Sequence, residues 1–157
     1  MASALEAHAF TSACAPARAP NSMLTHPAAP LGISIGTVTA ALTREWDQLK
    51  ASIKPGHAAV LSGATGAEPA TAEERAFLEA HGDLPVRATG SYIGHGLEPQ
   101  FVMNIALAAL ALDHASLFPP CDSSGLERPM SGDLQQILVT SVGHWRGEGL
   151  ALVERAD

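Results

Sequence analysis

The residues best suited to chemistry lie in one short stretch, 88–95, which reads ATGSYIGH. A strand is predicted over 84–89, and the apolar run FVMNIALAALAL predicts a helix that starts near Pro99 and is buried on all faces. His95 would then lie at the helix N-terminus, facing unpaired backbone N–H groups and the positive end of the helix dipole. Such a field opposes protonation, so a neutral imidazole could donate a hydrogen bond to a developing anion. We predict His95 as a catalytic residue; the alternative is a histidine satisfied by its local backbone.

The elements that must position His95 follow from hydrophobic periodicity. Helices are predicted over 37–53 and 71–80, the second opened by a capping box of Thr71 and Glu74. A strand of small and branched residues is predicted between these helices, over 57–64. Alternation of helix and strand indicates parallel strands and an α/β fold. Two further strands, predicted over 137–142 and 149–155, would form an antiparallel hairpin.

Residues 1–33 are rich in alanine and proline, and we predict a loosely ordered segment with a short helix over 2–9. A domain is predicted over 34–157. Cys14 lies in the first segment, where no buried strand or amphipathic helix flanks it. Because a nucleophilic thiol needs an activating environment, Cys14 is not expected to be catalytic.

Composition excludes several classes of function. Hydrophobic residues make up 46% and charged residues 16% of the 157 residues, which is typical of a globular protein rather than a disordered one. The formal net charge of −7 and the lack of a basic stripe argue against a nucleic-acid partner. The N-terminus has no signal-peptide pattern, and the apolar run is too short to span a membrane. We therefore expect a cytoplasmic protein that binds neither nucleic acid nor membrane.

Several motifs together resemble the C-terminal part of a β-ketoacyl-acyl carrier protein (ACP) synthase. They are ATGSYIGH with its apolar helix, then LFPP, then VTSVGHWRGEGLALVER, in an order that agrees from about Ser34 to the C-terminus. The resemblance implies the C-terminal half of a thiolase-like fold, with a mixed sheet, one buried central helix and a C-terminal β-hairpin. It also implies acyl-chain condensation on ACP, in fatty-acid or polyketide biosynthesis.

The resemblance assigns roles to individual positions. His95 matches the family histidine that polarises the malonyl thioester carbonyl, whereas Gly90 falls at the family lysine and Ala64 at the other catalytic histidine. Gly143 and His144 fall in the loop that gates the acyl pocket, although Trp145 replaces a small glycine there. The family's cysteine nucleophile has no counterpart over the matched stretch. Because such groups act as a unit, most of the condensing activity is expected to be lost.

Three interpretations remain open. The chain is a synthase-related protein that is incomplete when isolated, a non-catalytic accessory subunit that completes a partner synthase, or an inactive truncated product. The expected partners are ACP and either a synthase-like chain or a second copy. No cofactor is expected, and no metal, since His57, His81 and His114 lack ligand spacing. Glu98 would favour protonation of His95 if it approached the ring.

Overall fold

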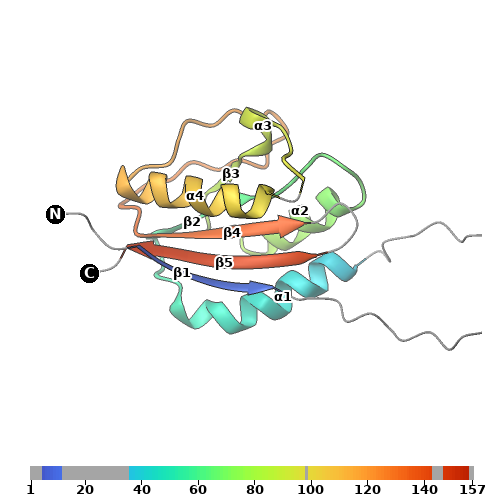
Figure 1. Cartoon of the computed structure of the whole chain (residues 1–157), viewed down its shortest axis with the longest axis horizontal. Helices are drawn as coiled ribbons and strands as arrows, with labels where there is room; N and C mark the ends of the chain where they lie inside the picture. The colour runs from blue at the N-terminus through green and yellow to red at the C-terminus, as the bar shows by residue number, and fades with distance from the viewer. Residues whose placement is uncertain (1–4, 12–35, 98, 143–146, 156–157) are drawn as a thin grey trace, which may run out of the picture.

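The computed structural model describes residues 5–11, 36–97, 99–142 and 147–155. The helices are α1 (Thr37–Leu49), α2 (Ala70–Ala80), α3 (Gly90–Ile93) and α4 (Gln100–Asp113), and a short 3-10 turn, Lys50–Ser52, follows α1. The strands are β1 (Leu5–Thr11), β2 (Ala58–Ser62), β3 (Val86–Ala88), β4 (Gln136–Val142) and β5 (Glu148–Arg155). Figure 1 shows these elements arranged around one sheet.

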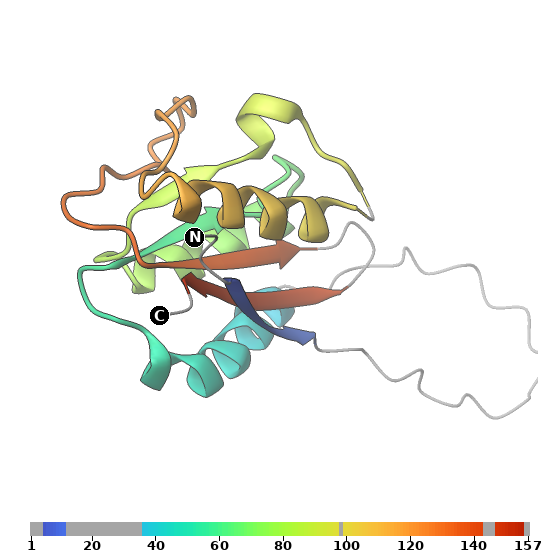
Figure 2. The same cartoon turned by 60° about the vertical axis from the view of Figure 1, so that its left-hand side comes forward.

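The sheet is mixed and has the strand order β1-β5-β4-β2-β3. β2 runs parallel to both β3 and β4, with Val60 opposite Val86 on one side and Leu138 on the other. β5 is antiparallel to β4 and to β1, and Figure 2 shows β1 beside β5 at the edge. The α/β class, the parallel strands and the C-terminal hairpin predicted from the sequence are confirmed.

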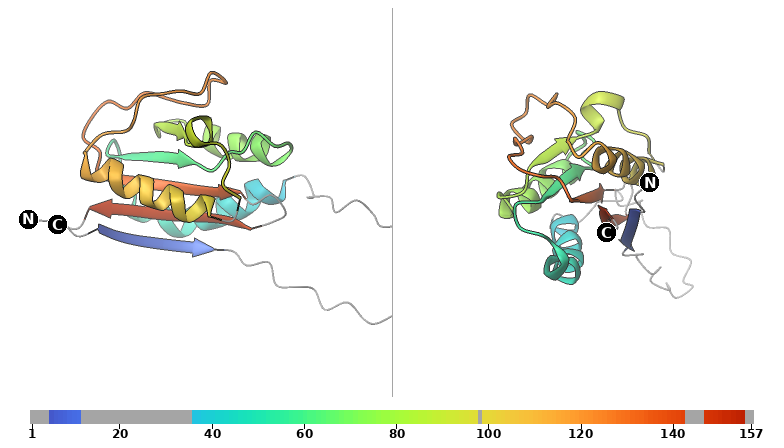
Figure 3. Two further views of the ribbon diagram at one scale, coloured as in Figure 1. Left: turned by 45° about the horizontal axis from the view of Figure 1, so that its top comes forward. Right: turned by 90° about the vertical axis from the view of Figure 1, so that its left-hand side faces the viewer.

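Helices cover both faces of the sheet. α1 and α2 pack on one face and α4 on the other, as the right-hand view of Figure 3 shows. Successive strand residues point to opposite faces, so Val60 and Leu138 pack toward α1 and α2 while Leu61 and Val139 pack toward α4. Every residue of β2 is buried, as expected for a strand covered on both faces.

The first segment of the chain contributes to the sheet. The predicted helix over 2–9 is wrong, because Leu5–Thr11 forms β1 and pairs along its length with β5. Alanine-rich composition favoured a helix, but pairing with a neighbouring strand outweighs such local propensity. The sheet therefore includes a strand from the segment that we had separated from the domain.

The start of α2 differs from the prediction. Its N-cap is Pro69 and no side chain caps it, so the capping box of Thr71 and Glu74 is wrong. The Glu74 carboxylate instead turns inward and accepts hydrogen bonds from Ser62 and Gly63 at the end of β2. Glu74 thus bonds to the end of β2 instead of capping its own helix.

Helix α4 is not buried on all faces. Its inner side carries Ala108 and Leu112, both inaccessible to solvent, whereas Val102 is 69% and Leu110 57% exposed. An apolar sequence does not by itself show which side of a helix is covered. The predicted position of this helix is correct, whereas the prediction that it is buried on all faces is wrong.

Candidate functional site

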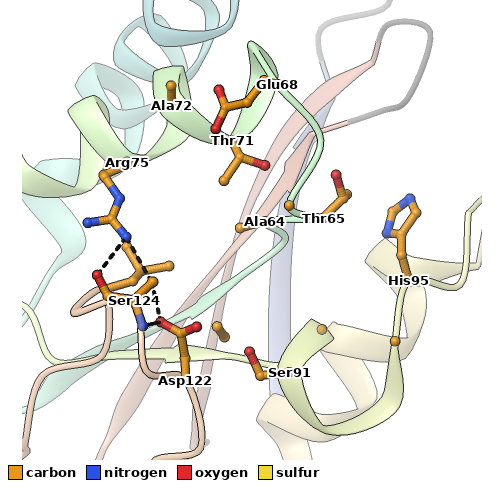
Figure 4. Close-up of a pocket in the computed structure, with 15 residues that line it drawn as sticks. Ala64, Thr65, Glu68, Thr71, Ala72, Arg75, Ser91, His95, Asp122 and Ser124 are labelled. Carbon is orange, nitrogen blue, oxygen red and sulfur yellow. Dashed lines mark hydrogen bonds between the residues drawn. The ribbon is translucent and has the colours of Figure 1, made fainter.

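The loops that follow β2 and β3 enclose a cavity of about 430 Å³ between α2, α3 and residues 122–126. Figure 4 shows His95 on one side of this cavity and Arg75 on the other, with Thr65 on the side of His95. The lining residues are Ala64, Thr65, Gly66, Glu68, Thr71, Ala72, Arg75, Ala88, Gly90, Ser91, Gly94, His95, Asp122, Ser124 and Leu126.

The wall that follows β2 is fixed by a buried polar cluster. Gly63 donates its backbone N–H to Thr140 Oγ1 at 2.8 Å and to Glu74 Oε1 at 3.2 Å. A Cβ at Gly63 would lie 2.6 Å from the carbonyl oxygen of Thr140, so the close approach of β2 and β4 requires glycine here. The Ser62 hydroxyl then accepts the N–H of Ala64 at 3.1 Å and sets the start of the cavity loop.

Glu74 is the ionisable centre of this cluster. Burial raises the pKa of its carboxyl, and the hydrogen bonds from Thr140, Ser62 and Gly63 only partly oppose the rise. Its Oε1 accepts all three bonds, whereas its Oε2 has no partner. The arrangement favours a neutral carboxyl that holds α2 against the ends of β2 and β4.

A second polar cluster positions the loop of His95. Thr89 Oγ1 donates to Asn104 Oδ1 at 2.8 Å, and Gln100 Nε2 donates to the same oxygen at 3.1 Å. Gln100 Oε1 in turn accepts the N–H of Gly96 at 2.6 Å, next to His95 in the chain. The end of β3 and the first turn of α4 therefore hold this loop, and His95 itself is half-buried.

The approach of the chain to α4 differs from the expectation. Helix α3, which the sequence did not predict, lies between β3 and the loop of His95. The backbone N–H groups of Gln100 and Met103 donate to the carbonyls of Leu97 and Pro99, respectively. Part of the N–H groups at the start of α4, which were expected to face His95, are therefore already hydrogen-bonded within the chain leading into the helix.

The opposite wall comes from α2 and residues 122–126. Arg75 Nη2 donates to the hydroxyl and the carbonyl of Ser124 at 2.8 and 3.1 Å, and Asp122 Oδ2 accepts the N–H of Ser124 at 3.1 Å. Glu127 anchors this segment to the sheet edge, because its carboxylate accepts the N–H groups of Ala88 and Asp122 at 3.0 and 2.8 Å. The wall is therefore tied to the same strand that leads to His95.

A buried arginine, Arg87, contacts the chain just before residues 122–126. Arg87, only 5% exposed, donates to the carbonyls of Phe118, Val86 and Arg128 at 2.8, 2.8 and 2.6 Å. Tyr92 also reaches this segment and donates its hydroxyl to the carbonyl of Pro119. Desolvation, followed by nearby Cys121 and Glu127, raises the pKa of Tyr92, which keeps its hydroxyl a donor.

The structure brings three of the predicted positions together. Ala64 on the loop after β2, Gly90 at the start of α3 and His95 on the loop after α3 all line the cavity. Gly143 and His144 lie outside the described residues, as do Cys14 and Glu98.

Gly90 is tightly placed within the cavity wall. A Cβ there would lie 2.9 Å from the carbonyl oxygen of Ala64, closer than normal packing allows. A lysine at this position would therefore shift one of the two loops. Glycine at position 90 therefore allows the backbones of the two segments to approach closely.

Arg75, Asp122 and Ser124 also line the cavity, although the sequence did not mark them as site residues. Arg75 appeared as an ordinary charged residue in the helix predicted over 71–80, and the other two lie in a loop that shows no periodicity. These residues lie 20 to 29 residues from His95 in the sequence, and no local pattern indicated that they would meet it at one cavity.

Within the part of the chain that is described, no group of three or more histidine, cysteine, aspartate or glutamate side chains is placed to hold a metal ion. His57 and His81 instead contact the carbonyl oxygens of Asp133 and Phe77 through Nδ1, at 3.1 and 2.8 Å. Among the same residues, no helix combines the length and apolar character needed to cross a membrane. The chain matches no protein-family model and no curated protein.

Proposed function

We propose that this chain is a β-ketoacyl-ACP synthase-related protein of fatty-acid or polyketide biosynthesis, which acts in the cytoplasm on acyl groups carried by ACP. The observation that carries the proposal is the meeting of Ala64, Gly90 and His95 on one cavity. These are the positions at which the resemblance places the family's two histidines and its lysine. The mixed sheet, helix α4 and the β4–β5 hairpin support a thiolase-like fold.

The side chains of the cavity suit a malonyl or acyl thioester. An imidazole N–H of His95 can donate to a thioester carbonyl, and the Arg75 guanidinium can pair with a carboxylate. These groups lie on opposite sides of the cavity in Figure 4, and the hydroxyls of Thr65 and Ser91 add neutral hydrogen-bonding groups. A malonyl thioester carries both a carbonyl and a carboxylate, so it could contact His95 on one side of the cavity and Arg75 on the other.

A non-catalytic accessory role is the second candidate, and one observation favours it. Neither cysteine nor lysine is among the described residues that line the cavity. Cys121 lies in the adjoining segment, where its exposed thiol contacts the Ser91 carbonyl at 3.9 Å. Without a thiolate in the cavity, acyl transfer lacks its nucleophile, and ligand binding becomes the function to test.

Binding is tested by titrating the full chain with malonyl-ACP and acetyl-ACP and following the heat of binding. We expect saturable binding that weakens in His95→Ala and, for the malonyl form only, in Arg75→Gln. His114→Ala is the matched control, because His114 is an exposed histidine outside this cavity. Binding that is absent, or that is unchanged in His95→Ala, would contradict the proposed site.

Condensation is tested separately with radiolabelled malonyl-ACP and an acyl thioester. We expect no carbon–carbon bond formation above background from the chain alone. Product formation would exclude the accessory role and would require a nucleophile outside the described part of the cavity.

A further inference from the structure

The loop that carries His95 has little rigidity of its own. His95 lies between Gly94 and Gly96, and Gly94 has a positive φ of 72°. Glycine restricts the backbone least of all residues, so a histidine between two glycines depends on contacts with other parts of the chain for a fixed position. On its N-terminal side, the N–H of Gly94 donates to the carbonyl of Gly90 at 3.0 Å, where α3 ends.

The contact on the C-terminal side comes from Gln100, the first residue of α4. Its side chain is 5% exposed, and its Oε1 accepts the N–H of Gly96 at 2.6 Å. A Cβ at Gly96 would lie 3.2 Å from this oxygen and 3.3 Å from Cε of Met103, so the loop backbone rests directly on the first turn of α4. A buried amide therefore holds the residue that follows His95.

The amide of Gln100 is fixed in its orientation. A backbone N–H can only donate, so the amide oxygen must face Gly96 and the NH₂ group must face away from it. On that side, Nε2 donates to Asn104 Oδ1 at 3.1 Å and to Thr89 Oγ1 at 3.3 Å. Both partners are buried, and Thr89 directly follows β3. Gln100 thus connects the end of the strand to the loop of His95.

We propose that Gln100 is the positioning residue for His95 and keeps its imidazole at the cavity by holding Gly96. The inference rests on the proposed function, since it concerns the same ligand, but the contact exists in the free protein and can be tested there. No hydrogen bond joins the His95 imidazole to another described residue, so its place among them depends on the backbone on either side. Movement of this backbone would carry the imidazole away from a thioester carbonyl.

Two substitutions separate the hydrogen bond from the volume of the side chain. Methionine has nearly the length of glutamine and no group that can replace the amide oxygen, so Gln100→Met removes the contact with Gly96 and keeps the packing. Gln100→Glu keeps an oxygen in the same place and should retain the contact. The buried Asn104 Nδ2 has no partner among the described residues, so the Asn104 amide can turn and donate to the second carboxyl oxygen. Thr89 can then donate to the Ser62 carbonyl, 3.3 Å away.

The first test follows the imidazole by NMR relaxation of the histidine rings in the ligand-free full chain, with His95→Ala used to assign the resonance. We expect Gln100→Met to lower the order parameter of the His95 ring by at least about 0.2, on the picosecond to nanosecond timescale. Gln100→Glu should restore the wild-type value. Rescue by glutamate would show that the oxygen facing Gly96, and not the amide as a whole, positions the ring.

Gln136→Met is the matched control for a loss of stability. Gln136 is also a buried glutamine, and its side chain makes three hydrogen bonds, to the N–H of Lys54, the Ser52 carbonyl and the Glu154 carboxylate. It begins β4, at the end of the sheet away from the cavity. Its loss should destabilise the fold, as measured by urea denaturation, and leave the order parameter of His95 unchanged.

Gly96→Ala approaches the same contact from the loop and leaves the buried cluster intact. The φ of Gly96 is not in the left-handed region, so alanine fits the backbone, but its Cβ would crowd the Gln100 oxygen, which is bonded at both ends of its amide and cannot move aside. We expect a more mobile His95 ring in this variant too. It keeps the proposal testable if Gln100→Met does not fold.

The second test is the affinity for malonyl-ACP and acetyl-ACP, measured by the heat of binding. The dissociation constant should rise at least about five-fold in Gln100→Met for both ligands, because both carry the carbonyl that His95 would contact. In Gln100→Glu it should return to within about two-fold of wild type. Loss for both ligands distinguishes this variant from Arg75→Gln, which should weaken only the malonyl form.

The proposed function and the role of Gln100 fail in different ways. A wild-type chain that binds neither ligand would contradict the function, while the NMR comparison would still decide whether Gln100 positions His95. A His95 ring that is equally mobile in wild type and Gln100→Met, or that Gln136→Met mobilises as much, would overturn the positioning role. So would a Gln100→Glu variant as mobile as Gln100→Met, or wild-type binding that Gln100→Met leaves unchanged.

Discussion

The two helical layers of this protein solve the same packing problem differently. α1 and α2 bury one side against the sheet and leave charged side chains exposed, such as Asp47, which forms an exposed ion pair at 2.7 Å with Lys50 in the turn after α1. α4 buries Ala108 and Leu112 but presents Val102 outward. The first layer has charged side chains at the solvent, whereas the exposed side of α4 carries apolar ones. A helix can therefore cover the sheet without presenting a polar side to water, and α4 is such a helix.

The largest effect is expected from removing the aromatic centre of the α1–α2 layer. Phe77 is 1% exposed, and its ring lies 4.6 Å from that of His81 and 6.4 Å from that of Trp46. Phe77→Ala should lower the free energy of unfolding by about 3–5 kcal/mol, measured by urea denaturation. Leu112→Ala is the counterpart on α4, with an expected loss of about 2–5 kcal/mol. A loss below about 1 kcal/mol for Phe77→Ala would show that this layer is not a close-packed core.

The next effect tests the polar anchor of α4. Asn104→Ala removes the oxygen that accepts hydrogen bonds from Thr89 and Gln100, and should lower the free energy of unfolding by about 1–3 kcal/mol. Gln48→Ala is the control, because this exposed amide on α1 makes only a long bond of 3.4 Å to the Arg44 carbonyl. Equal losses in the two variants would show that the buried cluster does not hold α4.

A smaller, pH-dependent effect is expected at the anchor of α2. Because burial raises the pKa of Glu74 in the folded state above its usual value of 4.5, the folded chain retains a proton that the unfolded chain loses. This contribution to stability is complete below pH 4.5 and is lost as the pH rises through the folded-state pKa. Glu74→Gln keeps an acceptor oxygen and cannot ionise, so its stability relative to wild type should increase with pH, by at most about 1.4 kcal/mol per pH unit.

The free energies of unfolding of wild type and Glu74→Gln are measured between pH 4 and 8 and subtracted. The contributions of carboxylates that titrate in both proteins cancel in this difference. A constant difference across the range would mean that Glu74 has the same pKa in the folded and unfolded chains.

The smallest effect is expected on the outer side of α4. Leu110→Ser should change the free energy of unfolding by less than about 0.5 kcal/mol, since the side chain is 57% exposed. Leu112→Ser, two residues away on the inner side, should be strongly destabilising. Dilute protein is used, because self-association through an exposed apolar surface would make the measured stability depend on concentration. Similar losses for Leu110→Ser and Leu112→Ser would contradict the one-sided burial of α4.

Much of the architecture could be predicted from local patterns. The helix over 37–53, the buried strand over 57–64 and the C-terminal hairpin each have the hydrophobic period of the element they form. The predicted helix over 2–9 was wrong because alanine-rich sequence carries little information about strand pairing. The capping box at Thr71 was wrong because a buried carboxyl found partners on two strands.

The candidate site was predictable only in part. The resemblance assigned Ala64 to the segment after β2, and Gly90 and His95 to the segment after β3; parallel strands bring such segments to the same end of a sheet. Arg75 and Ser124 could not be anticipated, because their contact joins α2 to a loop 49 residues later in the chain. Helix α3 was likewise missed, since four residues are too few to show a period.

Hydrophobic period and chain-breaking residues act over a few neighbours, so the sequence alone predicted α1, α2, α4 and the strands β2 to β5, but neither β1 nor α3. It also determined that α4 would be apolar. Three features depend on tertiary contacts: the Glu74 carboxyl bonds to the sheet, Arg75 and His95 lie on opposite sides of a cavity, and Val102 is exposed. These features depend on which distant surfaces meet, and the free energy of such contacts is set by burial and geometry that no local pattern contains.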